Sequence, residues 1–259
     1  MEYHKILYTV KDNIARITLN EPERMNRLSA EMDREIVHAL KVSETNDEVR
    51  VIIITGAGNA FCAGAALNEL LDHTASELKQ STEGYLEIAR TFSKLRKVSI
   101  AMVNGYALAG GCGLAMYPTF AIASETAKFG LPEINVGIWS AMASGILFRT
   151  VNRRKALELL CTGDLIDAYE AEKIGIINKA VPPGNLEKEV MNLAEKIRSK
   201  SAASLSLGLD ACYTATDMEY QKALSYLNEK VTFLATTRDA NEGLKAFLEK
   251  RKPQWSHRL

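Results

Sequence analysis

Apolar and polar residues alternate at the start of the chain. Residues 6–10 and 14–19 each alternate between the two classes, and Asp12-Asn13 separates them. Such alternation is typical of a half-buried strand, and an Asp-Asn pair between two strands is typical of a tight turn. The pattern predicts an antiparallel hairpin.

A longer period follows the hairpin. Apolar residues recur every three to four positions from Met32 to Leu40, and Ser29 precedes them with acidic residues in the next turn. We therefore expect an amphipathic helix with Ser29 as its N-cap. The β-branched run Val49–Thr55 comes next and ends in a glycine turn, which predicts a strand buried on both faces.

From this strand onward one unit recurs: a short apolar strand, a turn of small residues and a helix. Its strands are predicted at 51–54, 99–103, 120–123 and 174–181, and its turns at 63–65, 110–111 and 129–130. Recurrence of this kind predicts a wound α/β core over residues 1–181. The turns of such a core gather at one edge of the sheets, where ligands bind.

The pattern becomes helical after Pro182-Pro183. Residues 186–197, 204–213, 218–233 and 240–247 have the helical period, so residues 182–259 are predicted as a helical layer. One stripe in this layer is strongly apolar and comprises Tyr220, Leu224, Leu227 and Val231. It predicts an oligomer interface or, equally well, a core within the chain.

Composition narrows the function. Among 259 residues, 32 lysines and arginines balance 32 aspartates and glutamates, so nothing in the net charge favours a nucleic-acid partner or an anionic membrane. The chain has no apolar segment long enough for a membrane span and no leader pattern, so we expect a cytoplasmic protein. The four cysteines form no CxxC pair and are predicted to be buried, and the four histidines are scattered. No metal site is expected.

Two turns of small residues are candidates for chemistry. Residues 103–116 end a strand, pass through Gly110-Gly111 and begin a helix, so unsatisfied N–H groups stand at the positive helix end. Residues 61–68 form a second such turn. Two turns on neighbouring strands can supply the paired N–H donors of an oxyanion hole.

The third candidate segment carries one carboxylate. Residues 128–139 place Glu133 among apolar neighbours, where loss of hydration favours a role in proton transfer. A glutamate in a loop is ordinarily solvated, so the role of Glu133 depends on the other two segments.

Together the three segments resemble the crotonase family, the enoyl-CoA hydratase/isomerase group. Residues 61–67 are similar to its FxAGAD[IL] element, residues 103–116 to NGxxxGGGxELAM and residues 129–137 to FxxPExxxG. Further similarities lie at Asn26 and Leu28, in residues 168–181, and in the tail from Glu242 to Arg251. The resemblance covers essentially the whole chain.

This resemblance implies a fold, an assembly and a set of site residues. The fold is a spiral of ββα units followed by C-terminal helices, and the assembly is a homotrimer or homohexamer formed through residues 182–259. The N–H groups of Ala65 and Gly110 would hold the thioester oxygen, with Glu133 as the acid/base. The groove for coenzyme A would be lined by Met25, Asn26, Ala63, Ala65, Ala66, Leu67 and Asn68. Coenzyme A enters as part of the substrate, and no bound cofactor or metal is implied.

Some positions depart from the family pattern. Two-carboxylate hydratases have a glutamate where this chain has Gly113, so hydration by two glutamates is not supported, and removing one member of such a pair costs a factor of about 100 or more. A shift of a double bond from 3-enoyl to 2-enoyl needs one carboxylate, and single-glutamate hydration stays open. Ala66 replaces an aspartate. Gly113, Leu131 and Trp139 are expected to line the acyl pocket, with a core position as the alternative for Trp139.

Two other functions use the same features. A hydrolase or a carbon-carbon bond-cleaving enzyme acting on a cyclic or branched acyl-CoA would need the same oxyanion hole. A scaffold that binds coenzyme A without catalysis would keep the fold. The presence of Glu133 beside two small-residue turns favours an enzyme.

Overall fold

A hairpin begins the larger of two sheets. The computed structural model describes residues 2–65 and 74–257, and in it β1 (Ile6–Lys11) pairs antiparallel with β2 (Ile14–Leu19). Asp12 and Asn13 have φ of 50° and 61°, the left-handed conformation of a two-residue hairpin turn. The predicted hairpin is confirmed.

The larger sheet is parallel beyond the hairpin, and its central strands are buried on both faces. Its six strands run in the order β1-β2-β3-β5-β7-β10, with β3 at Val51–Gly56, β5 at Val98–Val103, β7 at Phe120–Ser124 and β10 at Lys179–Val181. Ile52 and Ile54 join one apolar core, whereas Val51 and Ile53 join another on the opposite face. This division explains why the β3 sequence is apolar at every position instead of alternating.

The second sheet is made of very short strands that follow those of the first. Its order is β4-β6-β8-β9, with β4 at Ala60–Cys62, β6 at Tyr106–Leu108, β8 at Lys128–Gly130 and β9 at Ile166–Asp167. The chain therefore alternates between the sheets in the pairs β3/β4, β5/β6 and β7/β8. The turns that lead into β4 and β6 approach so closely that a Cβ at Gly105 would lie 1.9 Å from the Asn59 carbonyl oxygen. The result is the predicted α/β spiral of ββα units.

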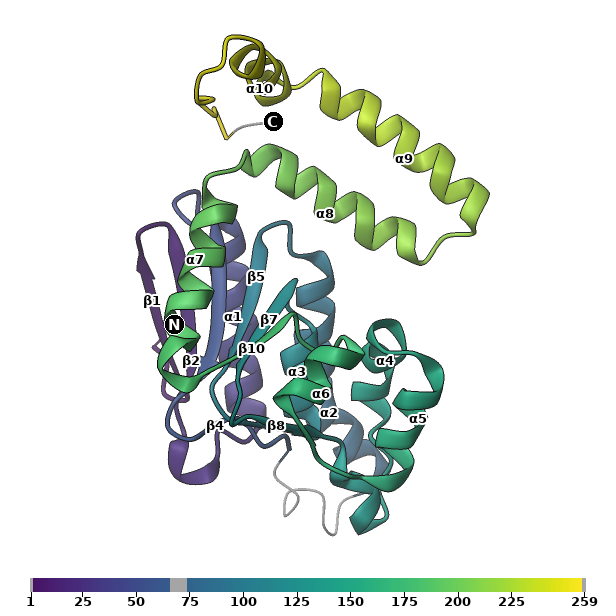
Figure 1. The fold of residues 1–259 in the computed structure, drawn as a ribbon. Helices are drawn as coiled ribbons and strands as arrows, with labels where there is room; N and C mark the ends of the chain where they lie inside the picture. Colours follow the sequence, from purple (N-terminus) through teal and green to yellow (C-terminus); the bar gives the residue numbers. More distant parts are fainter. Residues whose placement is uncertain (1, 66–73, 258–259) are drawn as a thin grey trace.

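Six helices of the described chain pack against the core that the two sheets share, which contains Ile52 and Ile54 of the larger sheet and Phe61 and Phe129 of the second (Figure 1). They are α1 (Ala30–Thr45), α2 (Ala75–Lys94), α3 (Gly110–Met116), α4 (Ala141–Thr150), α5 (Arg153–Thr162) and α6 (Ala168–Ile174). Two 3-10 turns, η1 (Pro22–Arg24) and η3 (Pro132–Val136), lie beside them. The predicted cap is confirmed, because the Ser29 hydroxyl accepts the Met32 N–H at 3.3 Å.

One predicted strand begins too early. Residues 174–181 were expected to be extended, but Ile174 ends α6, and only Lys179–Val181 pairs with β7. Gly175, at φ 90°, ends the helix in the left-handed conformation, and Ile176 and Ile177 turn into the core. The apolar run thus serves a helix end and a core contact before the strand starts.

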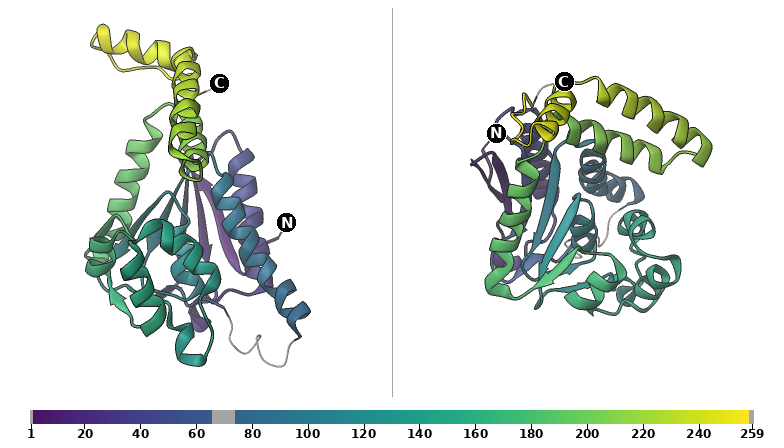
Figure 2. Two further views of the ribbon diagram at one scale, coloured as in Figure 1. Left: turned by 90° about the vertical axis from the view of Figure 1, so that its right-hand side faces the viewer. Right: turned by 45° about the horizontal axis from the view of Figure 1, so that its top comes forward.

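The C-terminal helices differ in how far they pack on the core. After η4 (Pro183–Asn185), α7 (Leu186–Arg198) packs on the outer face of the larger sheet through Leu186, Val190, Ala194 and Ile197. The helix α8 (Ala202–Thr216) contacts the same core through Leu205 and Leu209, whereas α9 (Tyr220–Ala235) and α10 (Arg238–Leu248) extend away from the sheets (Figures 1 and 2). The domain boundary after residue 181 stays a prediction, and the packing of α7 favours a boundary after that helix.

The apolar stripe of α9 is left exposed by the rest of the described chain, residues 2–65 and 74–257. Tyr220, Leu224, Leu227 and Val231 are 69%, 46%, 36% and 58% exposed. The alternative that this stripe forms an intrachain core is therefore wrong. Its use as an oligomer interface stays a prediction. Across the described parts of the chain, no helix combines the length and the apolar character needed to cross a bilayer.

Candidate active site

The two small-residue turns predicted from the sequence lie against each other. Gly64, at φ 83°, follows β4, and Gly110 begins α3 directly after the β6 segment. A Cβ at Gly64 would lie 2.9 Å from the Gly110 nitrogen and 2.6 Å from the Ala109 Cβ. The contact is too close for any side chain at position 64, so the glycine brings the backbone of one turn onto the other.

Backbone hydrogen bonds in the described part of the chain hold the two turns in place but do not use the N–H groups of Ala65 and Gly110. The Leu28 N–H donates to the Gly64 oxygen at 2.8 Å, and the Ala109 N–H donates to the Gly130 oxygen at 2.9 Å. Among the hydrogen bonds between described residues, none uses the N–H of Ala65 or Gly110 as donor. Gly110 is the first residue of its helix, where an N–H has no intrahelical acceptor. The two N–H groups predicted for the oxyanion hole thus lie on adjoining turns.

Ala109 joins them in a strained conformation. Its φ of 54° and ψ of −129° lie in a region that residues with a Cβ rarely adopt. The family motif NGxxxGGGxELAM has glycine at this position, where this chain has alanine. The Gly110 N–H belongs to the peptide group that follows Ala109, so the strained ψ of Ala109 sets the direction in which this N–H points.

The segment predicted to line the coenzyme A groove runs beside the first turn. The Ala63 N–H donates to the Met25 oxygen at 3.0 Å, and Leu28 forms a parallel bridge with Ala65. Met25 is 38% exposed. The predicted positions Ala66, Leu67 and Asn68 lie outside the described residues.

Asn26 is part of this segment, but its side chain serves the protein itself. It is fully buried, its oxygen accepts the Glu21 N–H at 2.9 Å, and its amide donates to the Ala57 and Ala60 oxygens at 2.8 Å. The expected contact with coenzyme A therefore cannot come from this side chain. Asn26 shapes the segment by holding its backbone.

Glu133 has one engaged oxygen and one open oxygen. It lies half-buried in η3, and the Ser140 hydroxyl donates to its Oε1 at 2.6 Å. Its Oε2 is buried and has no hydrogen-bond partner among the described residues. Ser140 precedes α4 as its N-cap residue, yet it makes no capping bond there. No sequence pattern marks this pairing, because the two residues meet only through the loop that separates η3 from α4.

Position 113 is crowded by a tyrosine. A Cβ at Gly113 would lie 2.2 Å from the Tyr85 hydroxyl oxygen and 3.2 Å from the Ala143 Cβ. The same hydroxyl donates to the Gly110 oxygen at 2.8 Å. Tyr85 lies on α2, and it reaches the site through contacts across the fold that no local sequence pattern marks.

The other two predicted pocket residues differ in exposure. Leu131 is 1% exposed and belongs to the main core. Trp139 is 44% exposed on the loop before α4, so its alternative role as a core residue is wrong. Of the three, Trp139 has its side chain at the surface.

The cysteines near the site are inert as nucleophiles. Cys62 and Cys112 are buried, and burial raises the pKa of each thiol to about 12, so both stay protonated at neutral pH. Cys161 and Cys212 are exposed, which corrects the expectation that all four cysteines are buried. Their helices turn these two positions away from the core.

Comparison with known proteins identifies the family. A profile of the enoyl-CoA hydratase/isomerase family matches residues 9–258. The chain belongs to this family. It is 38% identical over its whole length to a probable enoyl-CoA hydratase of Rhizobium meliloti, all of which is covered. It is also 35% identical, over 95% of its length and 82% of the relative, to the human mitochondrial enoyl-CoA hydratase domain-containing protein 3.

Solved structures of the family share the fold. A crystal structure of an enoyl-CoA hydratase subunit from Geobacillus kaustophilus matches with a TM-score of 0.94, 34% identity and full coverage of both chains. The human domain-containing protein 3 matches with a TM-score of 0.94, 32% identity, and coverage of 97% of this chain and 100% of that one. The chain is thus a hydratase/isomerase-type enzyme with the crotonase fold.

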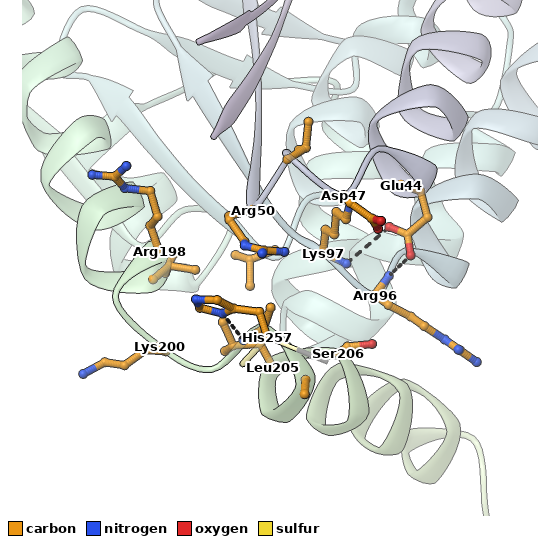
Figure 3. Close-up of a pocket in the computed structure, with 15 residues that line it drawn as sticks. Glu44, Asp47, Arg50, Arg96, Lys97, Arg198, Lys200, Leu205, Ser206 and His257 are labelled. Atoms are coloured by element: carbon orange, nitrogen blue, oxygen red, sulfur yellow. Dashed lines mark hydrogen bonds between the residues drawn. The ribbon is translucent and has the colours of Figure 1, made fainter. Parts of the chain in front are cut away.

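Figure 3 shows a cavity of about 480 Å³ whose lining includes none of the site residues described above. Residues that precede β3 and β5 line it, whereas the site follows the other ends of these strands. Its inner charges are engaged: Glu44 accepts the N–H groups of Arg96 and Lys97, and the Lys97 ammonium donates to two carbonyls. Within the described ranges, no group of three or more histidine, cysteine, aspartate or glutamate side chains could hold a metal ion.

Proposed function

We propose that this enzyme moves a double bond of an acyl-CoA thioester from the 3-enoyl to the 2-enoyl position, with Glu133 as its sole general acid/base. The observation that carries the proposal is the state of the Glu133 carboxylate. One oxygen is held by Ser140, and the other is buried without a partner among the described residues. A buried oxygen that lacks a hydrogen bond is costly to maintain, and a substrate proton would satisfy it.

The chemistry needs three groups. Glu133 Oε2 removes a proton from C2, and the electrons of that bond move to the thioester oxygen, forming a dienolate. The N–H groups of Ala65 and Gly110 hold the negative oxygen. The proton then passes from Glu133 to C4, the electrons return from the oxygen, and the double bond lies between C2 and C3.

Position 113 supports isomerisation over two-carboxylate hydration. Addition of water needs a group that orients the water in addition to the group that handles the α-proton. Gly113 offers no side chain, and the Tyr85 hydroxyl occupies the space next to it. A proton transfer between C2 and C4 requires one carboxylate, which Glu133 provides.

Hydration by Glu133 alone is the second candidate function. It is favoured by the relatives, since the Rhizobium meliloti protein is named a probable enoyl-CoA hydratase. In that case Glu133 would both activate water and return the proton on one face of the substrate. Hydrolysis, carbon-carbon bond cleavage and a role as a non-catalytic scaffold are further outcomes of the test below.

The substrate groove is proposed along residues 25–28 and 63–65. These two stretches run side by side and lead to the Gly110 turn, which suits an extended ligand whose thioester ends at the amides. Coenzyme A would enter as part of this substrate. We place the acyl chain near Trp139, whose exposed ring lies on the loop that joins Glu133 to Ser140.

Assembly and location belong to the same proposal. The exposed apolar residues of α9 and α10, among them Val231 and Phe247 at 58% and 80%, favour a homotrimer or a homohexamer. A cytoplasmic location stays a prediction.

The test compares wild type with Glu133→Gln on trans-2-enoyl, 3-enoyl and cyclic dienoyl thioesters. We expect wild type to convert 3-enoyl to 2-enoyl thioester and to exchange the transferred proton with D2O. Glu133→Gln should bind acyl-CoA normally and lose at least about 100-fold in kcat. Glu249→Gln is the matched control, because Glu249 is an exposed surface residue. Full turnover by Glu133→Gln would overturn the proposal, and binding without turnover on any thioester would favour the scaffold.

A further inference from the structure

Tyr85 packs against both ends of the first turn of α3. Its hydroxyl donates to the Gly110 oxygen at 2.8 Å, and its ring carbons lie 3.4 Å and 3.7 Å from where a Cβ of Gly110 would stand. The hydroxyl oxygen would lie 2.2 Å from a Cβ at Gly113. A single side chain from α2 thus contacts the proposed oxyanion residue and the position that carries no carboxylate.

The Tyr85 hydroxyl is unsuited to act as an acid. Its proton is already donated to the Gly110 oxygen. Burial raises the pKa of Tyr85 well above its ordinary value, and the nearby Tyr117 raises it further. The side chain is 8% exposed and belongs to the main core, so it is held in place by packing. Tyr85 is therefore a rigid side chain that limits the space around position 113.

We infer that Tyr85 is a specificity-determining residue: it fills the volume that a side chain at position 113 would need and thereby keeps a second, water-orienting carboxylate out of the site. The inference rests on the proposed function, in which Glu133 acts without such a carboxylate. Ala143 is the other residue near this position, and its Cβ would lie 3.2 Å from a Cβ at Gly113. The steric overlap with the Tyr85 hydroxyl oxygen is therefore the larger one.

The first experiment introduces a carboxylate at position 113 with Tyr85 present and with Tyr85 replaced by alanine. Gly113→Glu, Tyr85→Ala and the double variant are assayed for hydration of a trans-2-enoyl thioester and for isomerisation of a 3-enoyl thioester. We expect neither single variant to hydrate faster than wild type. The double variant should hydrate at least about tenfold faster than either, because a positioned acid/base contributes about 100-fold or more when its geometry is good.

A second experiment measures the contact through stability and does not depend on turnover. Gly113→Ala is made in wild type and in Tyr85→Phe, which keeps the ring and removes the hydroxyl. In wild type the new methyl group meets the hydroxyl, so the melting temperature should fall by about 4 °C or more. In Tyr85→Phe the same change should be neutral or stabilising, since alanine favours a helix over glycine.

Two results would overturn the inference. One is a Gly113→Glu variant that gains as much hydration as the double variant. The other is a Gly113→Ala change that has the same effect on melting temperature in both backgrounds. The stability cycle decides the question when the double variant fails to fold.

The proposed function fails in a different way. A wild-type enzyme that isomerises no 3-enoyl thioester, or a Glu133→Gln variant with full turnover, contradicts the role of Glu133 and leaves the stability cycle unaffected. If Glu133→Gln loses turnover but Gly113→Ala changes the melting temperature equally in wild type and in Tyr85→Phe, only the role of Tyr85 is rejected.

Discussion

Ser140 is the residue that sets the direction of the Glu133 carboxylate. Its hydroxyl donates to Oε1 at 2.6 Å, which leaves Oε2 to face the substrate in the proposed mechanism. Ser140→Ala should therefore reduce kcat about tenfold and leave KM nearly unchanged, because the carboxylate keeps its charge and loses its orientation. Steady-state kinetics check this prediction. Ser144→Ala is the control, since the Ser144 hydroxyl donates to the Ala141 carbonyl of its own helix.

Ala109 offers a prediction about strain. At φ 54° and ψ −129°, its Cβ costs about 1–3 kcal/mol, more than the entropy that glycine loses on folding. Ala109→Gly should raise the free energy of unfolding by about 1 kcal/mol, measured by urea denaturation. Ala107→Gly, in buried β6, should lower it. Equal destabilisation by the two changes would contradict the strain at Ala109.

The residues of the site were foreseen unequally. Gly110 and Glu133 stand in local patterns, a glycine turn before a helix and a carboxylate among apolar residues, which the sequence displays directly. Tyr85 and Ser140 acquire their roles from contacts across the fold: Tyr85 reaches position 113 from another helix, and Ser140 turns back to Glu133. A linear pattern carries no record of such contacts.

At the scale of elements, the C-terminal helices and the tail are joined at Asp239. This buried carboxylate accepts hydrogen bonds from the Ser201 hydroxyl at 2.6 Å, from the Ser256 N–H and hydroxyl at 2.7 Å, and from the His257 N–H at 3.2 Å. Burial by itself would raise the pKa of Asp239, but these hydrogen bonds outweigh it and hold the pKa below its ordinary value.

The lowered pKa predicts acid loosening of α10 and the tail. The hydrogen bonds stabilise the fold fully above the unfolded-state pKa of about 4, and this contribution is lost as the pH falls through the lower folded-state pKa. Hydrogen exchange of the α10 amides should therefore accelerate in wild type as the pH falls below about 4. Asp239→Asn should exchange faster at pH 6 and lack this acid-dependent increase. A parallel pH dependence in both proteins would contradict the prediction.

The predicted elements succeeded where the chain shows a clear period. The hairpin, α1 and the buried β3 were confirmed because each has enough residues to display alternation, a helical stripe or a continuous apolar run. Strands such as β4 and β8 are only three residues long, so no period could mark them, and residues 129–130 were expected to form a turn. The helix α2 was missed although Thr74 and Glu77 form a capping box at its start.

At the scale of the whole molecule, the apolar faces of the extended helices predict self-association. Leu224 and Val231 are 46% and 58% exposed on α9 and lie two helical turns apart, on one side. Changing both to glutamate should convert an oligomer into a monomer, measured by light scattering after size-exclusion chromatography. Lys222→Glu, on another side of α9, is the control and should leave the mass unchanged. A monomeric wild type would contradict the predicted assembly.

The alternation of the chain between two sheets has a consequence for its synthesis. When β5 and β6 have left the ribosome but β7 and β8 have not, each sheet ends in a parallel strand whose next neighbour is still missing. Unpaired edges of this kind attract other extended chains. Nascent chains halted at this point should aggregate more readily than chains halted after Val181, where β9 and β10 have completed both sheets.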